Sequence, residues 1–294
     1  MVRNVAHTRA IGQLLLAAFG WSIGGLLIKW IEWPPLAVAS GRGLIAALFL
    51  IVIQRGLRFT WSPVQLGAAL AYALTTLAFV SATKLTTAAN AILLQYTAPV
   101  WVALLGASLL NERARRADWI AIGVTFSGMA LFFADSLQLK GLFGNLAGVL
   151  SGICFAVMAI LMRKQKGGSV SESIILGNLI AAAIGLPFLL QAAPLDSSGW
   201  IALGVLGVVQ LGLPYLLYAR AIHHVTALEA VLIPVIEPIL NPVWVLLFLG
   251  EKPGVLSLCG GLLVLAAVTW RAANSIKLGY SAQPIKYSGS GPHP

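Results

Sequence analysis

The sequence predicts an all-α integral membrane protein, and three observations carry that prediction. Apolar residues make up 59% of the 294 residues, and charged residues make up only 10%. The mean hydropathy is +0.90, whereas a soluble domain has about 25% charged residues to cover its surface. The apolar residues also form long continuous runs. Strands of a β-barrel would instead alternate over about 10 residues, so these runs indicate helices.

Ten runs are long enough to cross a bilayer, because a transmembrane helix needs about 20 mostly apolar residues. In chain order, they are 10–28, 36–54, 64–83, 87–110, 117–134, 141–162, 172–191, 199–221, 226–249 and 253–271. The connections are too short to hold a soluble domain. Residues 272–294, rich in Gly, Ser and Pro, are expected to form a disordered polar tail.

The Lys and Arg residues predict the orientation of the chain. With the N-terminus in the cytoplasm, fourteen of the 19 fall on the cytoplasmic side and four on the other side. Loops rich in Lys and Arg stay in the cytoplasm, so both termini are expected there. The basic residues form no surface interleaved with aromatic residues, so the net charge of +10 does not indicate a nucleic-acid partner.

The two halves of the chain resemble each other. A shift of 139 residues brings residues 87–112 onto residues 226–251 without a gap, and it aligns Thr87 with Thr226, Pro99 with Pro238 and Glu112 with Glu251. The predicted units, 10–134 and 141–271, each hold five helices. Since five is odd, the second unit enters the membrane from the opposite side. Inverted repeats of this kind are typical of transporters, with a binding site between the repeats near the midplane.

Several short motifs occur in order along this pattern. They are Leu-Leu-Gln-Tyr-Thr-Ala-Pro at 93–99, Leu-Leu-Asn-Glu-Arg at 109–113, Ile-Glu-Pro at 236–238, Leu-Gly-Glu at 249–251, Gly-Trp-Ser at 20–22, and Arg42. With these motifs, residues 10–271 resemble the drug/metabolite transporter superfamily, in its EamA-like branch. The resemblance implies export of small organic solutes, often amino acids or related metabolites, across the bacterial inner membrane.

Glu237 lies near the middle of an apolar run. A charge there costs about 2.5–3.5 kcal/mol on insertion scales, so something must compensate it. One interpretation is a carboxylate in the solute pathway that binds a substrate amine or a proton. The other is a protonated side chain that bonds to backbone groups freed by nearby prolines.

Prolines predict a distorted helix around Glu237. Pro234, Pro238 and Pro242 are spaced by four residues and share one face. Each lacks an N–H group, so the helix is expected to kink or partly unwind there. Pro99 gives the fourth predicted helix a milder kink. These residues serve either gating or simple packing.

Further candidates for a solute site are Arg42 and the polar or aromatic residues inside the spans. Arg42 either holds a substrate carboxylate or anchors its helix, and packing is the alternative for the others. As a set they predict a neutral, partly aromatic pocket suited to a zwitterion with an apolar side chain. The candidates are Trp21, Tyr72, Thr75, Thr76, Asn90, Gln95, Tyr96, Gln210, Tyr215, Tyr218 and Asn241.

Motifs of an enzyme or a metal site are missing from the sequence. The four histidines are expected in loops or tails, and no metal-ligand spacing, nucleophile elbow, phosphate loop or dinucleotide fingerprint occurs. Glu112 and Glu251 fit as early-turn acids of the helices that follow them. We therefore expect a carrier without a cofactor, with proton coupling through Glu237 as one option. The alternatives are a translocase for lipids or lipid-linked sugars and a non-transporting scaffold.

Overall fold

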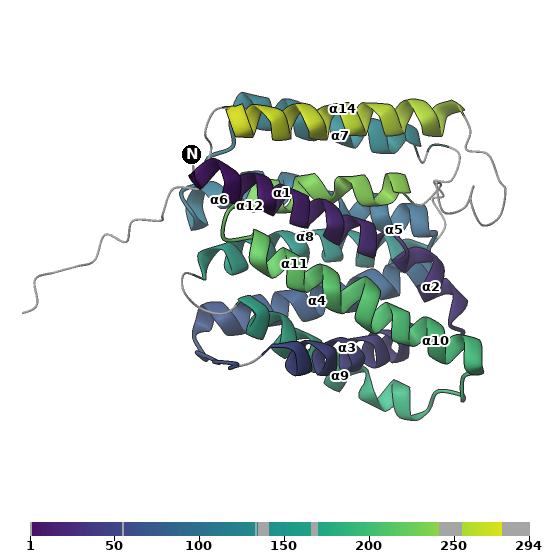
Figure 1. Cartoon of the computed structure of the whole chain (residues 1–294). Helices are drawn as coiled ribbons and strands as arrows, with labels where there is room; N and C mark the ends of the chain where they lie inside the picture. Colours follow the sequence, from purple (N-terminus) through teal and green to yellow (C-terminus); the bar gives the residue numbers. More distant parts are fainter. Residues whose placement is uncertain are drawn as a thin grey trace, which may run out of the picture.

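A computed structural model gives the structure of residues 2–54, 56–132, 134, 141–165, 170–240 and 255–277. Every regular element in these ranges is helical, which confirms the all-α prediction for the part of the chain described. The helices run along one common direction and form a bundle (Figure 1).

The helices of the first half begin at clear signals. Pro35 and Pro63 occupy the first turns of α3 and α4, where a missing N–H group costs nothing. Ser62 caps α4 by accepting a hydrogen bond from Gln65 N. The bounds are α1 Val2–Trp21, α2 Gly24–Trp30, α3 Pro35–Ile53, α4 Pro63–Leu85, α5 Ala88–Gln95, α6 Ala98–Leu109 and α7 Arg116–Phe132.

The second half contains two departures from α geometry. Leu206–Gly212 (η1) forms a π-helical turn between α10 and α11, and Ile233–Ile236 (η2) forms a 3-10 turn after α12. A short helical stretch follows at residues 237–240. The remaining bounds are α8 Leu142–Lys164, α9 Val170–Leu190, α10 Ser197–Val205, α11 Leu213–Ala221, α12 Ala227–Leu232 and α14 Val255–Lys277.

Within the described residues, seven helical segments are long and apolar enough to cross a membrane: Val5–Trp30, Pro35–Ile53, Pro63–Leu85, Asn90–Leu109, Leu142–Lys164, Val170–Leu190 and Ser197–Ala221. They correspond to the first four and the sixth to eighth predicted spans. The fifth and tenth predicted spans correspond to α7 and α14. α7 has 17 residues and the apolar part of α14 is Leu258–Asn274, so both are shorter than the seven segments named above. The ninth predicted span lies outside the described residues from 241 onward. The count of ten and the side of the termini stay predictions.

Two details differ from the sequence-based expectations. Helix α14 continues to Lys277, so residues 272–277, assigned to the polar tail, are helical, and the rest of that tail lies outside the described residues. His7, expected in a tail, lies in α1 and is buried. The carboxylate of Glu229, from the other half of the chain, stabilises His7 there. A contact between residues so far apart cannot be predicted from the local sequence.

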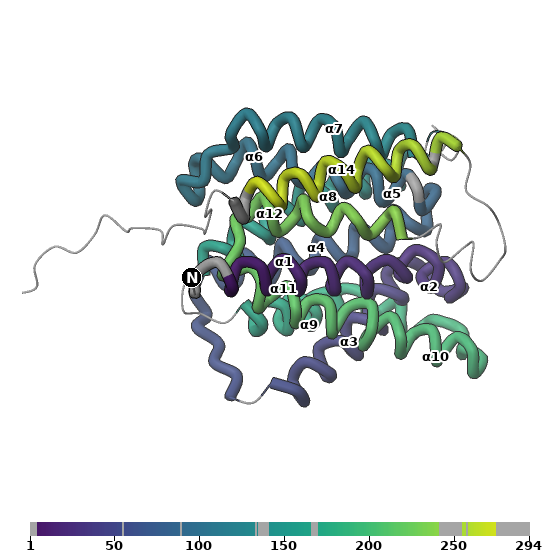
Figure 2. The backbone as a smooth tube through the Cα atoms, turned by 45° about the horizontal axis from the view of Figure 1, so that its top comes forward, coloured from purple at the N-terminus to yellow at the C-terminus, as the bar shows by residue number. Residues whose placement is uncertain are grey.

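The main helix pairs each join the first half of the chain to the second. α4 packs on α8 and α1 on α11 in the middle of the bundle. α3 packs on α9 along one side, and α7 on α14 along the other (Figures 1 and 2). A side-chain carbon at Gly260 would lie 2.4 Å from Gly128 O, so the closeness of α7 and α14 requires glycine there. Such close backbone approach is how helices associate in lipid.

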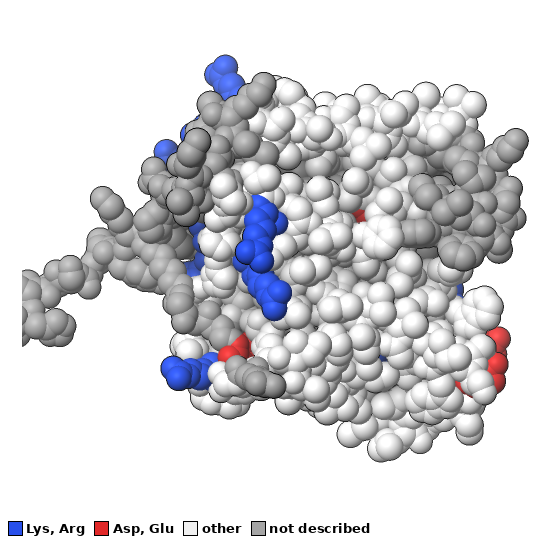
Figure 3. Space-filling view, in the orientation of Figure 1, with Lys and Arg blue, Asp and Glu red and all other residues white. Residues whose placement is uncertain are grey.

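The surface of the bundle suits a bilayer. Large apolar side chains such as Val52, Leu190 and Leu262 are exposed. On the face shown in Figure 3, the Lys and Arg side chains gather mainly toward the end at which α1 begins, while the middle is largely uncharged. Because basic residues favour the cytoplasmic interface, this distribution agrees with the orientation that the sequence predicts.

Candidate functional site

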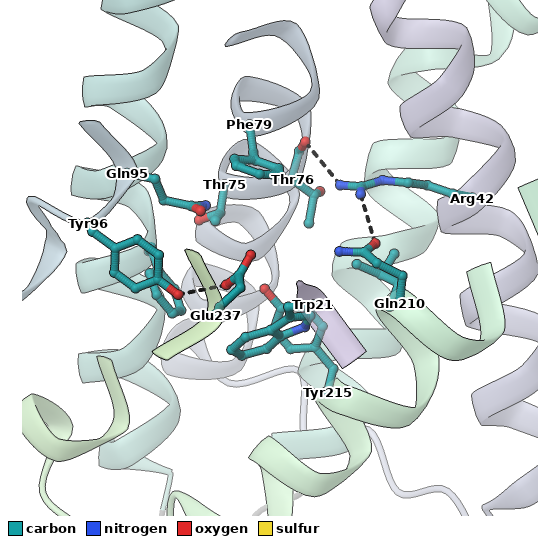
Figure 4. Close-up of a pocket in the computed structure, with 12 residues that line it drawn as sticks. Trp21, Arg42, Thr75, Thr76, Phe79, Gln95, Tyr96, Gln210, Tyr215 and Glu237 are labelled. Atoms are coloured by element: carbon teal, nitrogen blue, oxygen red, sulfur yellow. Dashed lines mark hydrogen bonds between the residues drawn. The ribbon is translucent and has the colours of Figure 1, made fainter. Parts of the chain in front are cut away.

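A small cavity lies between the two halves of the chain (Figure 4). Both halves contribute to its wall. The lining residues are Trp21, Arg42, Thr75, Thr76, Phe79, Gln95, Tyr96, Phe155, Gln210, Leu211, Tyr215 and Glu237.

Among the described lining residues, Glu237 supplies the one carboxyl group, and its side chain points into the cavity (Figure 4). The residue is 7% exposed. Tyr96 Oη lies 2.6 Å from Glu237 Oε2 and 2.8 Å from Pro234 O. A residue from the first half of the chain thus holds the acid of the second half in place.

Arg42 supplies the one cation of the lining as far as the described part of the chain forms it. It is 1% exposed, and it donates hydrogen bonds to Gln210 Oε1 at 3.1 Å and to Thr76 O at 3.4 Å. Among the described residues no group accepts a hydrogen bond from its Nε atom. Within the same residues no ion pair joins Arg42 to Glu237. The cavity therefore holds a guanidinium and a carboxyl group that form no ion pair with each other in the described part of the chain.

Aromatic rings form one wall of the cavity. The rings of Trp21 and Tyr215 are 5.0 Å apart, and those of Trp21 and Phe155 meet edge to face at 6.3 Å. Behind them, Tyr72 contacts Tyr215 at 4.6 Å in a T-shaped arrangement. Aromatic pairs at these distances stabilise each other, so the wall is firmly packed.

Breaks in the helices place polar groups on the cavity. The chain leaves α geometry at Tyr96, between α5 and α6, and Pro99 lies in the first turn of α6. The π-helical turn η1 carries Gln210. Single π turns inside helices are frequent at functional sites because they redirect side chains. Gly24 makes room for this turn, since a side-chain carbon there would lie 2.8 Å from Gln210 Nε2.

Comparison with known proteins decides the family. The model of the EamA-like transporter family matches residues 8–134 and 142–271, which together are most of the chain. The chain belongs to the EamA-like transporter family. It is accordingly a transporter rather than an enzyme, and a multi-pass membrane protein.

Relatives agree with this assignment. The chain is 30% identical over 228 residues to an uncharacterized transporter of Archaeoglobus fulgidus, covering 76% of this chain and 83% of that one. It is 25% identical over 263 residues to the pseudopaline exporter CntI of Pseudomonas aeruginosa, covering 86% of this chain and 92% of that one. A crystal structure with 20% identity has the same fold, with a TM-score of 0.76 over 90% of this chain and 99% of that chain.

The structure brings most of the predicted site residues together in this EamA-like transporter. Trp21, Arg42, Thr76, Gln95, Tyr96, Gln210, Tyr215 and Glu237 all line the cavity. Tyr72 lies behind Tyr215 and exchanges hydrogen bonds with Asn178, and Asn90 bonds to Asn145 away from the cavity. Pro234 lies in η2 and Pro238 in the helical stretch that follows. Asn241 and Pro242 lie outside the described residues.

Three lining residues are not among the sequence-based candidates. Phe79, Phe155 and Leu211 contribute apolar surface to the cavity. The sequence does not distinguish an apolar residue that lines the cavity from one that packs elsewhere, because this depends on which face of the helix the residue occupies. The four-residue spacing of Thr75 and Phe79 on α4 is the one hint available for Phe79, since residues four apart share a face.

Proposed function

We propose that this protein is a secondary carrier that exports small zwitterionic metabolites, most of all amino acids, across the bacterial inner membrane by alternating access. The observation that carries the proposal is that one cavity presents a guanidinium, Arg42, and an ionisable carboxyl group, Glu237, with no ion pair between them in the described part of the chain. A buried charge without a partner is costly. A solute that brings a carboxylate and an ammonium group would relieve both costs at once.

The lining suggests how such a solute lies. Its carboxylate would accept hydrogen bonds from the guanidinium of Arg42, whose planar donors match a carboxylate. Its ammonium group would face Glu237. An apolar side chain would lie against Trp21 and Tyr215, whose rings are 5.0 Å apart. The name of the relative from Pseudomonas aeruginosa, an exporter, supports the outward direction of transport.

Hydrogen bonding around Tyr96 supports coupling to protons. Its hydroxyl group has one hydrogen but lies within 2.8 Å of two oxygens, Pro234 O and Glu237 Oε2. The carbonyl can only accept. When Tyr96 donates to Pro234 O, the hydrogen of the 2.6 Å contact comes from Glu237, which is then a neutral acid. An arriving ammonium group would replace that proton, and exchange of one for the other is the basis of antiport.

The packing of the halves supports alternating access. The helix pairs that pack most extensively, α4 with α8, α3 with α9, α7 with α14, α4 with α9 and α1 with α11, all join the two halves. The two stretches matched by the family model coincide closely with the predicted five-helix units, 10–134 and 141–271. Two inverted units around one cavity can exchange conformations and so open it to either side in turn.

Efflux from proteoliposomes tests the proposal. The vesicles are loaded with a panel of labelled amino acids, with decarboxylated analogues and with sugars, and release is followed with and without a pH gradient. Saturable release of some amino acids, without release of their decarboxylated analogues, is the expected result. If correctly folded protein releases none of the panel, the cavity does not serve amino acids and the proposal fails.

A further inference from the structure

Two short helices, α5 and α12, begin in the same way at opposite ends of the bundle (Figures 1 and 2). Thr87 caps α5 and accepts a hydrogen bond from Asn90 N at 3.0 Å. Thr226 caps α12 and accepts one from Glu229 N at 3.1 Å. The 139-residue shift aligns Thr87 with Thr226 and Asn90 with Glu229. The two helix starts therefore occupy equivalent positions, with an amide at one and a carboxylate at the other.

At the α12 end, Glu229 belongs to a buried group of charges, and we call His7, Asp118, Glu229 and Arg271 the charged cluster. His7 Nε2 lies 3.3 Å from Glu229 Oε2, and Arg271 Nη1 lies 3.8 Å from Glu229 Oε1. Arg271 Nε also pairs with Asp118 Oδ1. His7 and Asp118 belong to the first half of the chain, and Glu229 and Arg271 to the second. Two of the three contacts in the cluster, His7 with Glu229 and Arg271 with Asp118, join the two halves.

A second ion pair reinforces this end. Arg163 Nε lies 3.2 Å from Glu112 Oε1, and Glu112 Oε2 accepts a hydrogen bond from Ala227 N at 2.9 Å. Glu112 belongs to the first half, whereas Arg163 and Ala227 belong to the second. The first half thus caps the first turn of a helix in the second half, which ties the two together beside the charged cluster.

At the α5 end, neutral groups take the equivalent places, and we call Thr86, Asn90 and Asn145 the amide cluster. Asn90 Nδ2 donates to Asn145 Oδ1 at 3.0 Å, and Thr86 Oγ1 donates to the same oxygen at 3.0 Å. Asn145 lies in the first turn of α8 and His7 in the second turn of α1, so each comes from the start of the first long helix of its half. This cluster also joins the two halves.

We propose that the charged cluster and the amide cluster are the two gates of the transport pathway, and that the charged cluster holds its end more firmly. The proposal rests on the carrier function proposed above, because only a carrier needs both ends to open. Opening either end requires separating the halves where these contacts join them. Hydrogen bonds between charged groups are roughly twice as strong as neutral ones, so the two gates differ in strength. By the orientation that the sequence predicts, the firm gate faces the cytoplasm.

Accessibility of a cysteine in the cavity tests this directly. The reporter is Thr75→Cys, a near-isosteric change at a lining residue, in a full-length chain that also carries Cys154→Ala and Cys259→Ala. A membrane-impermeant maleimide is applied to right-side-out and to inside-out vesicles. With both clusters intact, the reporter is expected to label faster from the side of the amide cluster.

Variants then open each gate separately. Glu229→Gln is expected to raise the labelling rate from the charged-cluster side roughly tenfold, since one hydrogen bond between charged groups exceeds the free energy that corresponds to that factor. Asn145→Ala is expected to raise the rate from the other side by a smaller factor. Glu172→Gln is the matched control. It changes a buried carboxylate that accepts a hydrogen bond from Arg58 N and lies outside the charged cluster, and it should leave both rates unchanged.

Two results would overturn the proposal: an unchanged rate from the charged-cluster side in Glu229→Gln, or an equal rise from both sides. If Glu229→Gln does not yield folded protein, His7→Gln removes the same contact and carries the test. Labelling needs no transported solute. If the carrier proposal is wrong, the efflux experiment alone will show it. If the gate proposal is wrong, the labelling experiment alone will show it.

Discussion

Glu229 and Glu237 are two buried acids of one short stretch of chain, yet their surroundings are opposite. Glu229 is 1% exposed, and its oxygens lie within reach of Thr226 N at 2.9 Å, Thr226 Oγ1 at 3.2 Å, His7 and Arg271. Glu237 is 7% exposed, faces the cavity, and among the described residues receives one side-chain hydrogen bond, from Tyr96.

The difference teaches that burial alone does not make an acid functional. The partners of Glu229 fill its bonding capacity, so it serves the structure and the contact between the halves. Glu237 keeps capacity that a solute or a proton can use. The same contrast holds for the cations, because Arg271 pairs with two acids, whereas Arg42, within the residues that the structure describes, donates hydrogen bonds only to the neutral acceptors Gln210 and Thr76.

The largest effect is expected from Glu229→Ala. This change removes the carboxylate partner of buried His7 and one of the two acids that pair with Arg271, and breaking a buried ion pair costs about 3–5 kcal/mol. Thermal unfolding in detergent, followed by intrinsic tryptophan fluorescence, measures the loss. A melting temperature equal to that of the unchanged protein would contradict the structural role given to this acid.

Arg42 is expected to affect binding rather than folding. Arg42→Gln should weaken binding of a transported amino acid by roughly 10-fold to 100-fold, because hydrogen bonds to charged groups contribute about 1.5–3 kcal/mol. Binding of an amine that lacks the carboxylate should stay the same. Arg42→Lys is the matched control, since it keeps the charge and loses the planar pair of donors. Equal losses for the two ligands would show that Arg42 only supports the fold.

Thr226→Ala tests the cap that positions Glu229. Thr226 and Glu229 form a reciprocal capping box at the start of α12. Loss of such a cap costs about 1 kcal/mol. Unfolding by a denaturant measures it, and Thr87→Ala at the equivalent start of α5 is the comparison. A larger loss at Thr87 would reverse the order of strength that we assign to the two ends.

The smallest expected effect is a pH dependence at Glu112, which lies in the connection between α6 and α7. Burial raises the pKa of this carboxyl above 4.5, although Ala227 N–H and Arg163 act against the rise. The folded protein therefore holds the proton more tightly than the unfolded chain. The resulting contribution of Glu112 to the free energy of unfolding is complete below pH 4.5, and it is lost as the pH rises through the raised pKa of the folded state.

Glu112→Gln should remove this contribution from the pH dependence of unfolding. Unfolding of both proteins between pH 4 and pH 8 measures it. If the difference in stability between the two proteins does not change with pH, Glu112 is not the titrating group.

Much of the site could be predicted because charged and polar residues stand out in apolar runs. Glu237 and Arg42 are such residues, and Tyr96 and Gln210 follow from the same reasoning. Pro234 and Pro238 indicated where α geometry would fail, and the chain does pass through a 3-10 turn there. The all-α class followed from the composition together with the long continuous apolar runs.

What could not be predicted depends on contacts between distant parts of the chain. Glu112 was expected to be an early-turn acid of the helix that follows it. That expectation was wrong, since α7 begins at Arg116 and Glu112 instead caps α12 and pairs with Arg163. His7 meets Glu229 at a sequence separation of 222 residues. The π turn around Gln210 also escaped notice, because Leu206–Gly212 reads as ordinary apolar helix.

The most direct test of the central claim, that Glu237 is the acid available to solute and proton, is efflux by Glu237→Gln with and without a pH gradient. For an amino acid that the unchanged protein releases, we expect a fall in efflux of at least roughly tenfold, loss of the response to the gradient, and an unchanged melting temperature. Efflux that keeps both its rate and its dependence on the gradient would contradict the account and would return Glu237 to a structural role.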